Sequence, residues 1–307
     1  MKKYLLFALF IYGVIFGQNI QVISNQPITR VEQGKFFYPQ VSPTGENIIF
    51  TSENYDGIWI YNNSNGKIEK IVETGGAGYE PKFSADGNQI VYRENEFINN
   101  LKYSSIHKID LQSKNDEILE NKTRNLTPPL ESTTKAAAYV VEERLVIKNI
   151  SGDLQKIDNS DERVVTIENS EMVIYSNGER IVYTPLGDGN YLWPSISPSG
   201  TKLLFTLAGK GTYITDFDGN VISELGYAHY PNWSNGGKWI VYMEDHDDGY
   251  NVTDSEIFVV SVDGTIKVKL TNSDKINEMY PRWSSVDNEI VYNTTDGVIY
   301  KLKLKID

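Results

Sequence analysis

Residues 230–271 read YPNWSNGGKWIVYMEDHDDGYNVTDSEIFVVSVDGTIKVKLT, and this stretch decides the fold. Aromatic and β-branched runs separated by Asn-Gly and Asp-Gly pairs are typical of antiparallel hairpins. We expect four short strands, with turns between them at Asn235–Gly237 and Asp263–Gly264, at residues 230–234, 239–243, 257–262 and 266–270. The stretch therefore predicts one four-stranded antiparallel unit.

The same unit recurs along the chain. Its first strand carries an aromatic residue, a proline, a large apolar residue and a serine before a turn, and this motif begins at Tyr38, Tyr79, Trp193, Tyr230 and Tyr280. At Tyr79 one extra residue precedes the proline. Residues 120–190 lack the motif but keep turn-linked hairpins, so we expect two degenerate units there. A repeat of this kind predicts units that stack side by side to bury their apolar faces.

Counting the units predicts an all-β protein: a β-propeller of four-stranded antiparallel blades. Third strands give seven blades, and six if the two degenerate units merge into one. The last unit ends with a third strand at residues 298–306 and has no fourth. We expect an N-terminal strand at Ile28–Glu32 to complete this sheet, because closing the ring removes the exposed strand edges that invite aggregation.

The repeat resembles that of a known family. The pattern Pro-x-Trp-Ser-x-x-Gly, two strands, Asp-Gly, strand, Leu-Thr is similar to the WD40-like (PD40) repeat of the TolB-type β-propellers, closely at residues 230–271 and well at 280–300. Residues 120–190 depart from the pattern. The resemblance implies structural roles for Trp233 and Trp283, which would wedge between blades. It also implies a platform for protein partners, often at one end of the axial channel.

The N-terminus has the features of a secretory signal peptide at residues 1–17. Two lysines precede an apolar run from Tyr4 to Phe16, and Gly17 precedes a polar start. The run is shorter than the roughly 20 residues that span a bilayer, although an uncleaved anchor is the alternative. We therefore expect residues 18–307 to form a single propeller domain that is periplasmic or secreted, monomeric, and without a stable membrane span.

Composition excludes several classes of function. The chain has no cysteine, which rules out disulfides, thiolate metal sites and a cysteine nucleophile. Its formal charge is −12, and removing Lys2 and Lys3 with the signal leaves −14. Such an acidic chain is not expected to bind nucleic acid, but it suits cations or basic partners.

Catalytic motifs are missing from the sequence, so no catalytic residue is assigned. There is no Gly-x-Ser-x-Gly elbow and no His-Glu-x-x-His zinc motif. Three residues near the innermost strands, His229, Tyr230 and Arg282, are candidates for binding a ligand at the channel mouth. We expect a protein- or peptide-binding scaffold that requires no cofactor. The alternative is a carbohydrate- or ester-processing hydrolase or lyase, which would pair His229 with a nearby carboxylate.

One acidic interval, residues 244–256, separates the second and third strands of the opening stretch. It holds six carboxylates and one histidine, with no lysine or arginine. Clustered carboxylates repel one another unless protons or a hard cation intervene, and calcium prefers several such oxygens. The candidate calcium ligands are Asp245, Asp247, Asp248, Asp254 and Glu256. The alternative is a solvated acidic loop.

Overall fold

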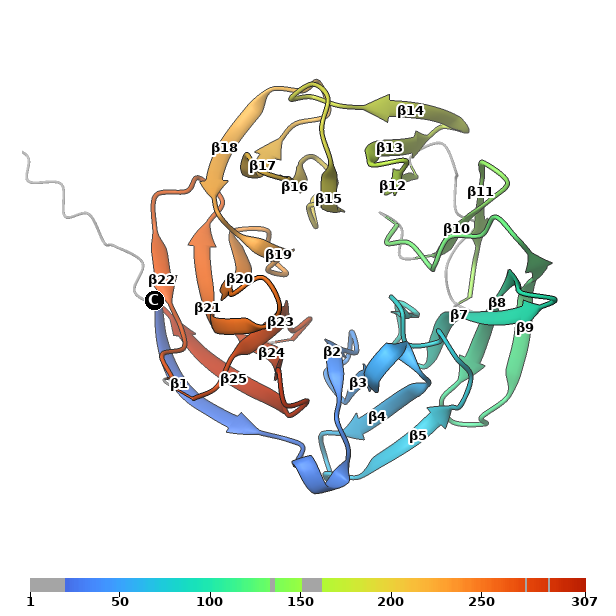
Figure 1. Cartoon of the computed structure of the whole chain (residues 1–307), viewed down its shortest axis with the longest axis horizontal. Coiled ribbons are helices and arrows are strands. Elements are labelled where there is room, and N and C mark those ends of the chain that lie inside the picture. The colour runs from blue at the N-terminus through green and yellow to red at the C-terminus, as the bar shows by residue number, and fades with distance from the viewer. Residues whose placement is uncertain (1–19, 133–135, 151–161, 274, 287) are drawn as a thin grey trace, which may run out of the picture.

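The computed structural model describes residues 20–132, 136–150, 162–273, 275–286 and 288–307. The signal peptide predicted at residues 1–17 lies outside them. The described residues form seven antiparallel sheets that follow one another around a central axis (Figure 1). Their only helical turns are the short 3-10 segments Val31–Gln33 and Glu53–Tyr55, and none of their helices is long and apolar enough to cross a membrane.

Apart from an N-terminal strand that joins the C-terminal sheet, consecutive strands pair within each described sheet, so each sheet is a small meander. In chain order the strands are β2 (Phe37–Val41), β3 (Asn47–Thr51), β4 (Ile58–Asn62) and β5 (Ile68–Val72); β6 (Lys82–Phe83), β7 (Gln89–Ile98), β8 (Leu101–Asp110) and β9 (Asp116–Thr123); β10 (Ala137–Val141) and β11 (Arg144–Lys148); β12 (Arg163–Glu168), β13 (Glu171–Ser176) and β14 (Glu179–Tyr183); β15 (Tyr191–Ile196), β16 (Leu203–Leu207), β17 (Gly211–Thr215) and β18 (Val221–Gly226); β19 (His229–Trp233), β20 (Trp239–Asp247), β21 (Val252–Ser261) and β22 (Lys267–Lys269); and β23 (Glu278–Trp283), β24 (Glu289–Thr294) and β25 (Ile299–Ile306), with β1 (Ile20–Pro27) beside β25.

This arrangement confirms the prediction of an all-β propeller. The two sheets with fewest strands, β10–β11 and β12–β14, lie where the sequence motif is missing. In place of a regular inner strand, the segment before β10 makes isolated bridges from Leu126 to Val141 and from Leu130 to Ala138. Loss of the proline-serine motif thus coincides with loss of a regular innermost strand.

The N-terminal strand lies earlier in the chain than the sequence analysis expected. β1 pairs antiparallel with β25, from Ile20 opposite Ile306 to Pro27 opposite Tyr300. The expected position, Ile28–Glu32, was wrong, because the chain enters a 3-10 turn at Val31. Only Ile20 of β1 is buried, so this outermost strand carries no alternation of buried and exposed residues that would mark it.

The acidic interval is a β-hairpin rather than a loop. β20 continues to Asp247 and β21 begins at Val252, so the expected strand ends at residues 243 and 257 were wrong. Asp245 lies opposite Ser255, and His246 lies opposite Asp254. We call residues 244–256 the acidic hairpin. The sequence did not predict these parts of the strands, because the exposed arms of a hairpin lack the alternation of apolar and polar residues that a buried face produces.

The core lies between neighbouring sheets. The largest apolar cluster joins the β19–β22 sheet to the C-terminal sheet through buried residues such as Val259 and Leu302, and Trp283 packs against it. Trp233 packs against the cluster that links Leu204 of β16 to Ile240 of β20. Both tryptophans therefore wedge between sheets, as the repeat motif implied.

Candidate functional site at the central channel

The aromatic-proline pair of the repeat sits at an irregularity of the innermost strand. In β2, β15, β19 and β23 the pairing register shifts across this pair. In each of these strands the residue before the proline has a positive φ: Tyr38 (55°), Trp193 (49°), Tyr230 (51°) and Tyr280 (54°). Positive φ values are uncommon for bulky side chains. A β-bulge re-aims a side chain out of the regular pleat. The repeat thus directs aromatic side chains toward one another around the axis.

Glu80 takes this position in the β6–β9 sheet. It directly precedes Pro81 and has a φ of 53°, as the aromatic residues of the other sheets do. The sequence motif predicts Tyr79 at this position, with Glu80 as an extra residue. The structure instead makes Glu80 the equivalent residue, and its place directly before the proline was the signal that could have revealed it.

A run of aromatic rings borders the channel. Ring centroids are 4.9 Å apart for Tyr79 and Tyr55, 4.9 Å for Tyr55 and Tyr38, 4.4 Å for Tyr38 and Tyr280, 5.1 Å for Tyr280 and Tyr230, and 6.2 Å for Tyr230 and Trp193. These separations are those of favourable tilted, stacked and edge-to-face ring pairs. We call these six residues the aromatic arc. It links side chains from separate sheets into one surface.

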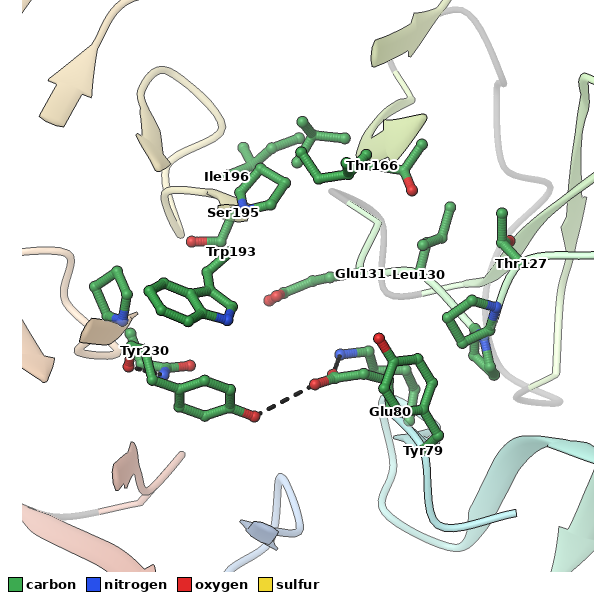
Figure 2. A pocket seen from close by; sticks show the side chains of 18 of the residues that line it. Tyr79, Glu80, Thr127, Leu130, Glu131, Thr166, Trp193, Ser195, Ile196 and Tyr230 are labelled. Atoms are coloured by element: carbon green, nitrogen blue, oxygen red, sulfur yellow. Dashed lines mark hydrogen bonds and ion pairs between the residues drawn. The ribbon is translucent and has the colours of Figure 1, made fainter. Parts of the chain in front are cut away.

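Beside the arc lies a cavity of about 310 Å³. Figure 2 shows Trp193, Tyr230, Glu80 and Glu131 directed toward its interior from different parts of the ring. A smaller cavity of about 180 Å³ shares Glu131, Ser195, Ile196, Asn232 and Arg282 with the first. The shared lining residues make the two cavities adjacent parts of the central channel.

Three donors converge on the Glu80 carboxylate. Arg282 Nη2 lies 3.2 Å from each carboxylate oxygen, Lys82 Nζ donates at 3.0 Å, and the Tyr230 hydroxyl donates at 3.3 Å. Arg282 Nη2 also donates to the Tyr230 hydroxyl oxygen at 3.0 Å. The Glu80 and Arg282 side chains keep 30% and 20% of their exposure, because they face the channel. The cluster ties β19 and β23 to the start of the β6–β9 sheet across the axis.

The charges of this cluster fix its protonation. Burial alone would raise the pKa of Glu80, but Lys82 and Arg282 outweigh burial and lower that pKa to about 2. Burial acts to lower the pKa of Arg282, yet Tyr230 and Glu80 hold it above its ordinary value. Burial raises the pKa of Tyr230, so its hydroxyl remains a neutral donor. The cluster is therefore ionic throughout the neutral pH range.

His229 lies beside the arc, outside the residues that line the cavity. Its Nδ1 is 2.8 Å from Asp245 Oδ1, and its ring centroid is 5.3 Å from that of Trp193. The Tyr227 hydroxyl donates to the Asp245 carbonyl at 2.9 Å and lies 3.1 Å from His229 Nδ1. Of the three channel-mouth candidates, Tyr230 and Arg282 thus share the cavity wall, while His229 connects the arc to the acidic hairpin.

The candidate calcium ligands are dispersed over the hairpin. The turn uses Asp247 and Asp248 as acceptors, from the backbone N–H of Gly249 at 2.8 Å and of Asn251 at 2.8 Å. Asp254 lies 3.9 Å from His246, and Glu256 is buried beside Lys269 at 3.1 Å. Nowhere in the described part of the chain do three or more His, Cys, Asp or Glu residues form a group that could hold a metal ion. Calcium binding stays a prediction, which calorimetry with calcium would test.

Comparison with known proteins supports the fold. No family model and no curated protein matches the sequence. Among solved structures, the chain is similar to the Cps50 (Swd1) β-propeller domain of Myceliophteria thermophila, with 9% identity, coverage of 93% of this chain and 99% of the other, and a TM-score of 0.61. It is also similar to a TolB candidate from Agrobacterium tumefaciens, with 16% identity, coverage of 95% and 99%, and a TM-score of 0.54.

TolB from Acinetobacter baumannii is a further structural neighbour. The match has 16% identity and a TM-score of 0.50, and it covers 82% of this chain. The chain spans only 58% of that protein's length. Identities this low show the fold alone, and the fold that they show is a β-propeller like those of the TolB proteins.

Proposed function

We propose that the protein is an exported β-propeller that binds a protein or peptide segment at the mouth of its central channel, without catalysing a reaction. In this proposal the ring has seven blades, and β1 closes it by completing the C-terminal sheet. The observation that carries the proposal is the aromatic arc beside the 310 Å³ cavity. The TolB-like fold supports it.

The arc has the properties of a recognition surface. Its members before the prolines hold positive φ values, and such strain persists where the surroundings over-determine it, often at ligand-binding sites. Tyr79 is 39% exposed, and Tyr38, Tyr55, Trp193 and Tyr280 are partly exposed. Exposed, clustered aromatic rings are enriched at protein interfaces, and the cavity falls within the size range of ligand sites.

A second function is favoured by one contact. The 2.8 Å pairing of His229 with Asp245 has the geometry of an acid-base pair, which a carbohydrate- or ester-processing enzyme would need. His229 does not line the cavity, so a substrate of this pair would have to bind outside it, near Trp193. Turnover of such a substrate that is lost in a His229→Gln variant would favour the enzyme over the scaffold.

Export is proposed from Lys2, Lys3 and the apolar run that follows them. Expression of the full chain and of a chain that begins at residue 18, followed by cell fractionation, tests this part. The full chain should appear in the periplasm or medium with residues 1–17 removed, and the shortened chain should stay in the cytoplasm. Full-length protein that stays in the cytoplasm would contradict export.

Site-specific photo-crosslinking tests the binding site. A benzoylphenylalanine residue replaces Tyr79 of the arc in one variant, and in the control it replaces Val221, which is 48% exposed on β18. In cells of the native organism we expect a discrete crosslinked product from position 79 that position 221 does not give. No product from position 79, or the same product from both positions, would count against a binding site at the channel mouth.

A further inference from the structure

The acidic hairpin is fixed against one end of the aromatic arc. Asp245 holds His229 and Tyr227, and the His229 ring in turn contacts Trp193, the last member of the arc. On the far strand, the Asn277 side chain donates to the Val252 carbonyl at 3.0 Å. A segment bound along the arc would therefore run toward the hairpin.

Four of the six carboxylates of this hairpin have no lysine or arginine partner among the described residues, although two of them lie near a histidine. Glu244 and Glu256 form ion pairs with Lys267 and Lys269. In the described residues, no lysine or arginine forms an ion pair with any of the other four, which are Asp245, Asp247, Asp248 and Asp254. At the tip between them Tyr250 is 95% exposed, so a partner can approach this surface.

A further carboxylate lies near the opposite end of the arc. Asp56 follows Tyr55 directly and is exposed, and no described lysine or arginine pairs with it. Within the cavity, the Glu131 side chain is exposed; burial acts to lower the pKa of Arg282, and the charge of Glu131 helps Tyr230 and Glu80 to raise it. Carboxylates thus lie near both ends of the arc and in the cavity, where Arg93 beside Tyr79 and Lys82 and Arg282 in the cavity wall offset part of the charge.

The rings of the arc already accept guanidinium groups from the protein itself. The guanidinium carbon of Arg93 lies 5.5 Å from the Tyr79 ring centroid, and that of Arg282 lies 5.3 Å from the Tyr230 ring centroid. Both distances are within the range of cation–π attraction. Arginine suits such a surface better than lysine, because its planar group stacks on rings while still donating to carboxylates.

We propose that the segment bound at the channel mouth is an arginine-rich peptide, whose guanidinium groups lie on the aromatic arc and pair with the carboxylates of the acidic hairpin. This inference rests on the proposed function and specifies its partner. The arc and the cavity form the binding site in this inference. The hairpin supplies the complementary charge that attracts the peptide.

Fluorescence anisotropy with a labelled peptide of six arginines tests the inference. The variant Asp247→Asn/Asp248→Asn keeps side-chain oxygens that can accept the turn's hydrogen bonds and removes two charges. The control Glu46→Gln/Asp218→Asn removes two exposed charges from the β2–β3 and β17–β18 turns. In a four-stranded meander, the turns after the first and third strands lie at one end of the sheet, and the turn after the second strand lies at the other. The two control substitutions are therefore at the end opposite the β20–β21 turn and leave the site unchanged.

We expect the hairpin variant to weaken peptide binding about three- to tenfold, mainly at low salt, and the control to stay within twofold of wild type. Tyr79→Ala should also weaken binding, and a peptide of six glutamates should not bind. Equal effects of the two double variants would mean non-specific attraction and would overturn the inference. If crosslinking at position 79 succeeds while the arginine peptide fails, the partner chemistry is wrong but the binding site stands.

Discussion

Glu80 is a carboxylate in a position that the other complete repeats give to an aromatic ring. A charged group facing a narrow channel loses hydration, and it is stable there only if charged partners replace that hydration. Lys82 and Arg282 do so, and Tyr230 adds a hydroxyl donor. At this position an ion pair with Arg282 and Lys82 therefore replaces the ring contact that an aromatic residue would make.

The variant Glu80→Gln tests the strength of this tie. We expect it to lower the free energy of unfolding at pH 7 by roughly 2 kcal/mol, less than the 3–5 kcal/mol of a fully buried pair because the channel admits water. The folded-state pKa of about 2 lies below the ordinary value, so the wild-type stabilisation is present above about pH 4.5 and is lost as the pH falls toward 2. Urea unfolding at pH 7 and pH 3 measures both effects.

Glu69 provides the matched control. Its pKa is also lowered to about 2, by hydrogen bonds from Lys114 and Lys67, but all three side chains lie at the surface. Surface ion pairs contribute little because water screens them, so Glu69→Gln should cost less than about 1 kcal/mol. Equal losses for Glu69→Gln and Glu80→Gln would show that the channel environment does not strengthen the Glu80 cluster.

Sequence reasoning named two residues of this cavity wall. Tyr230 and Arg282 were proposed as ligand candidates because they lie near the innermost strands, and their role in binding stays a prediction. Glu80 and Glu131 were missed for physical reasons: Glu80 departs from the aromatic pattern, and Glu131 belongs to the segment where the motif is lost. A cluster that joins residues about two hundred positions apart depends on ring geometry, which local patterns do not encode.

At the scale of elements, the extended hairpins were the largest difference from expectation. β20 and β21 run past the core, as do β7 and β8, whose tip exposes Phe97 at 71%. Inside the core, apolar alternation marks a strand clearly. Beyond it the backbone ladder continues without a buried face, so the sequence pattern no longer distinguishes a strand from a loop.

β21 and β23 meet at a buried pair of carboxylates. Glu256 is 5% exposed and Glu278 is 2% exposed, and each has one buried oxygen without a hydrogen-bond partner in the described structure. Ser273 contacts both: its N–H donates to Glu256, and its hydroxyl lies 3.3 Å from Glu278 Oε1. Burial, and then the charge of Glu256, raise the pKa of Glu278 to about 7, against weaker lowering by a backbone hydrogen bond, by Ser273 and by Lys269.

This pair predicts that stability falls as the pH rises. Glu278 binds its proton more tightly in the folded chain than in the unfolded chain, so the free energy of unfolding should decrease between about pH 4.5 and pH 7 and then level off. Glu278→Gln keeps a neutral side chain and should flatten this decrease. We expect the variant to be more stable than wild type at pH 8, by on the order of 1–3 kcal/mol.

Urea unfolding of both proteins at pH 5 and pH 8 measures the difference. Glu46→Gln, which removes an exposed carboxylate, is the control and should follow wild type at both values. A Glu278→Gln variant that is less stable than wild type at pH 8 would show that the charged carboxylate is stabilised by a partner.

At the scale of the whole molecule, the first and last described strands pair in one sheet. β1 pairs with β25 over most of its length, and past β1 the Thr29 hydroxyl accepts from the Ile299 N–H at 2.8 Å. Little apolar surface is buried by β1, so its contribution lies in backbone hydrogen bonds and in covering the edge of β25. Uncovered, β25 would expose the alternating sequence Ile-Tyr-Lys-Leu-Lys-Leu-Lys-Ile.

If β1 closes the ring, as proposed, removing it should open the ring without destroying its core. Compared with a chain that begins at residue 18, a chain that begins at residue 28 should melt several degrees lower and self-associate in size-exclusion chromatography, because an unpaired edge recruits another strand. A synthetic peptide of residues 18–27 should restore monomer and melting temperature by adding the missing strand in trans, and a scrambled peptide should not. An unchanged melting temperature after the deletion would show that pairing with β25 contributes nothing to the stability of the ring.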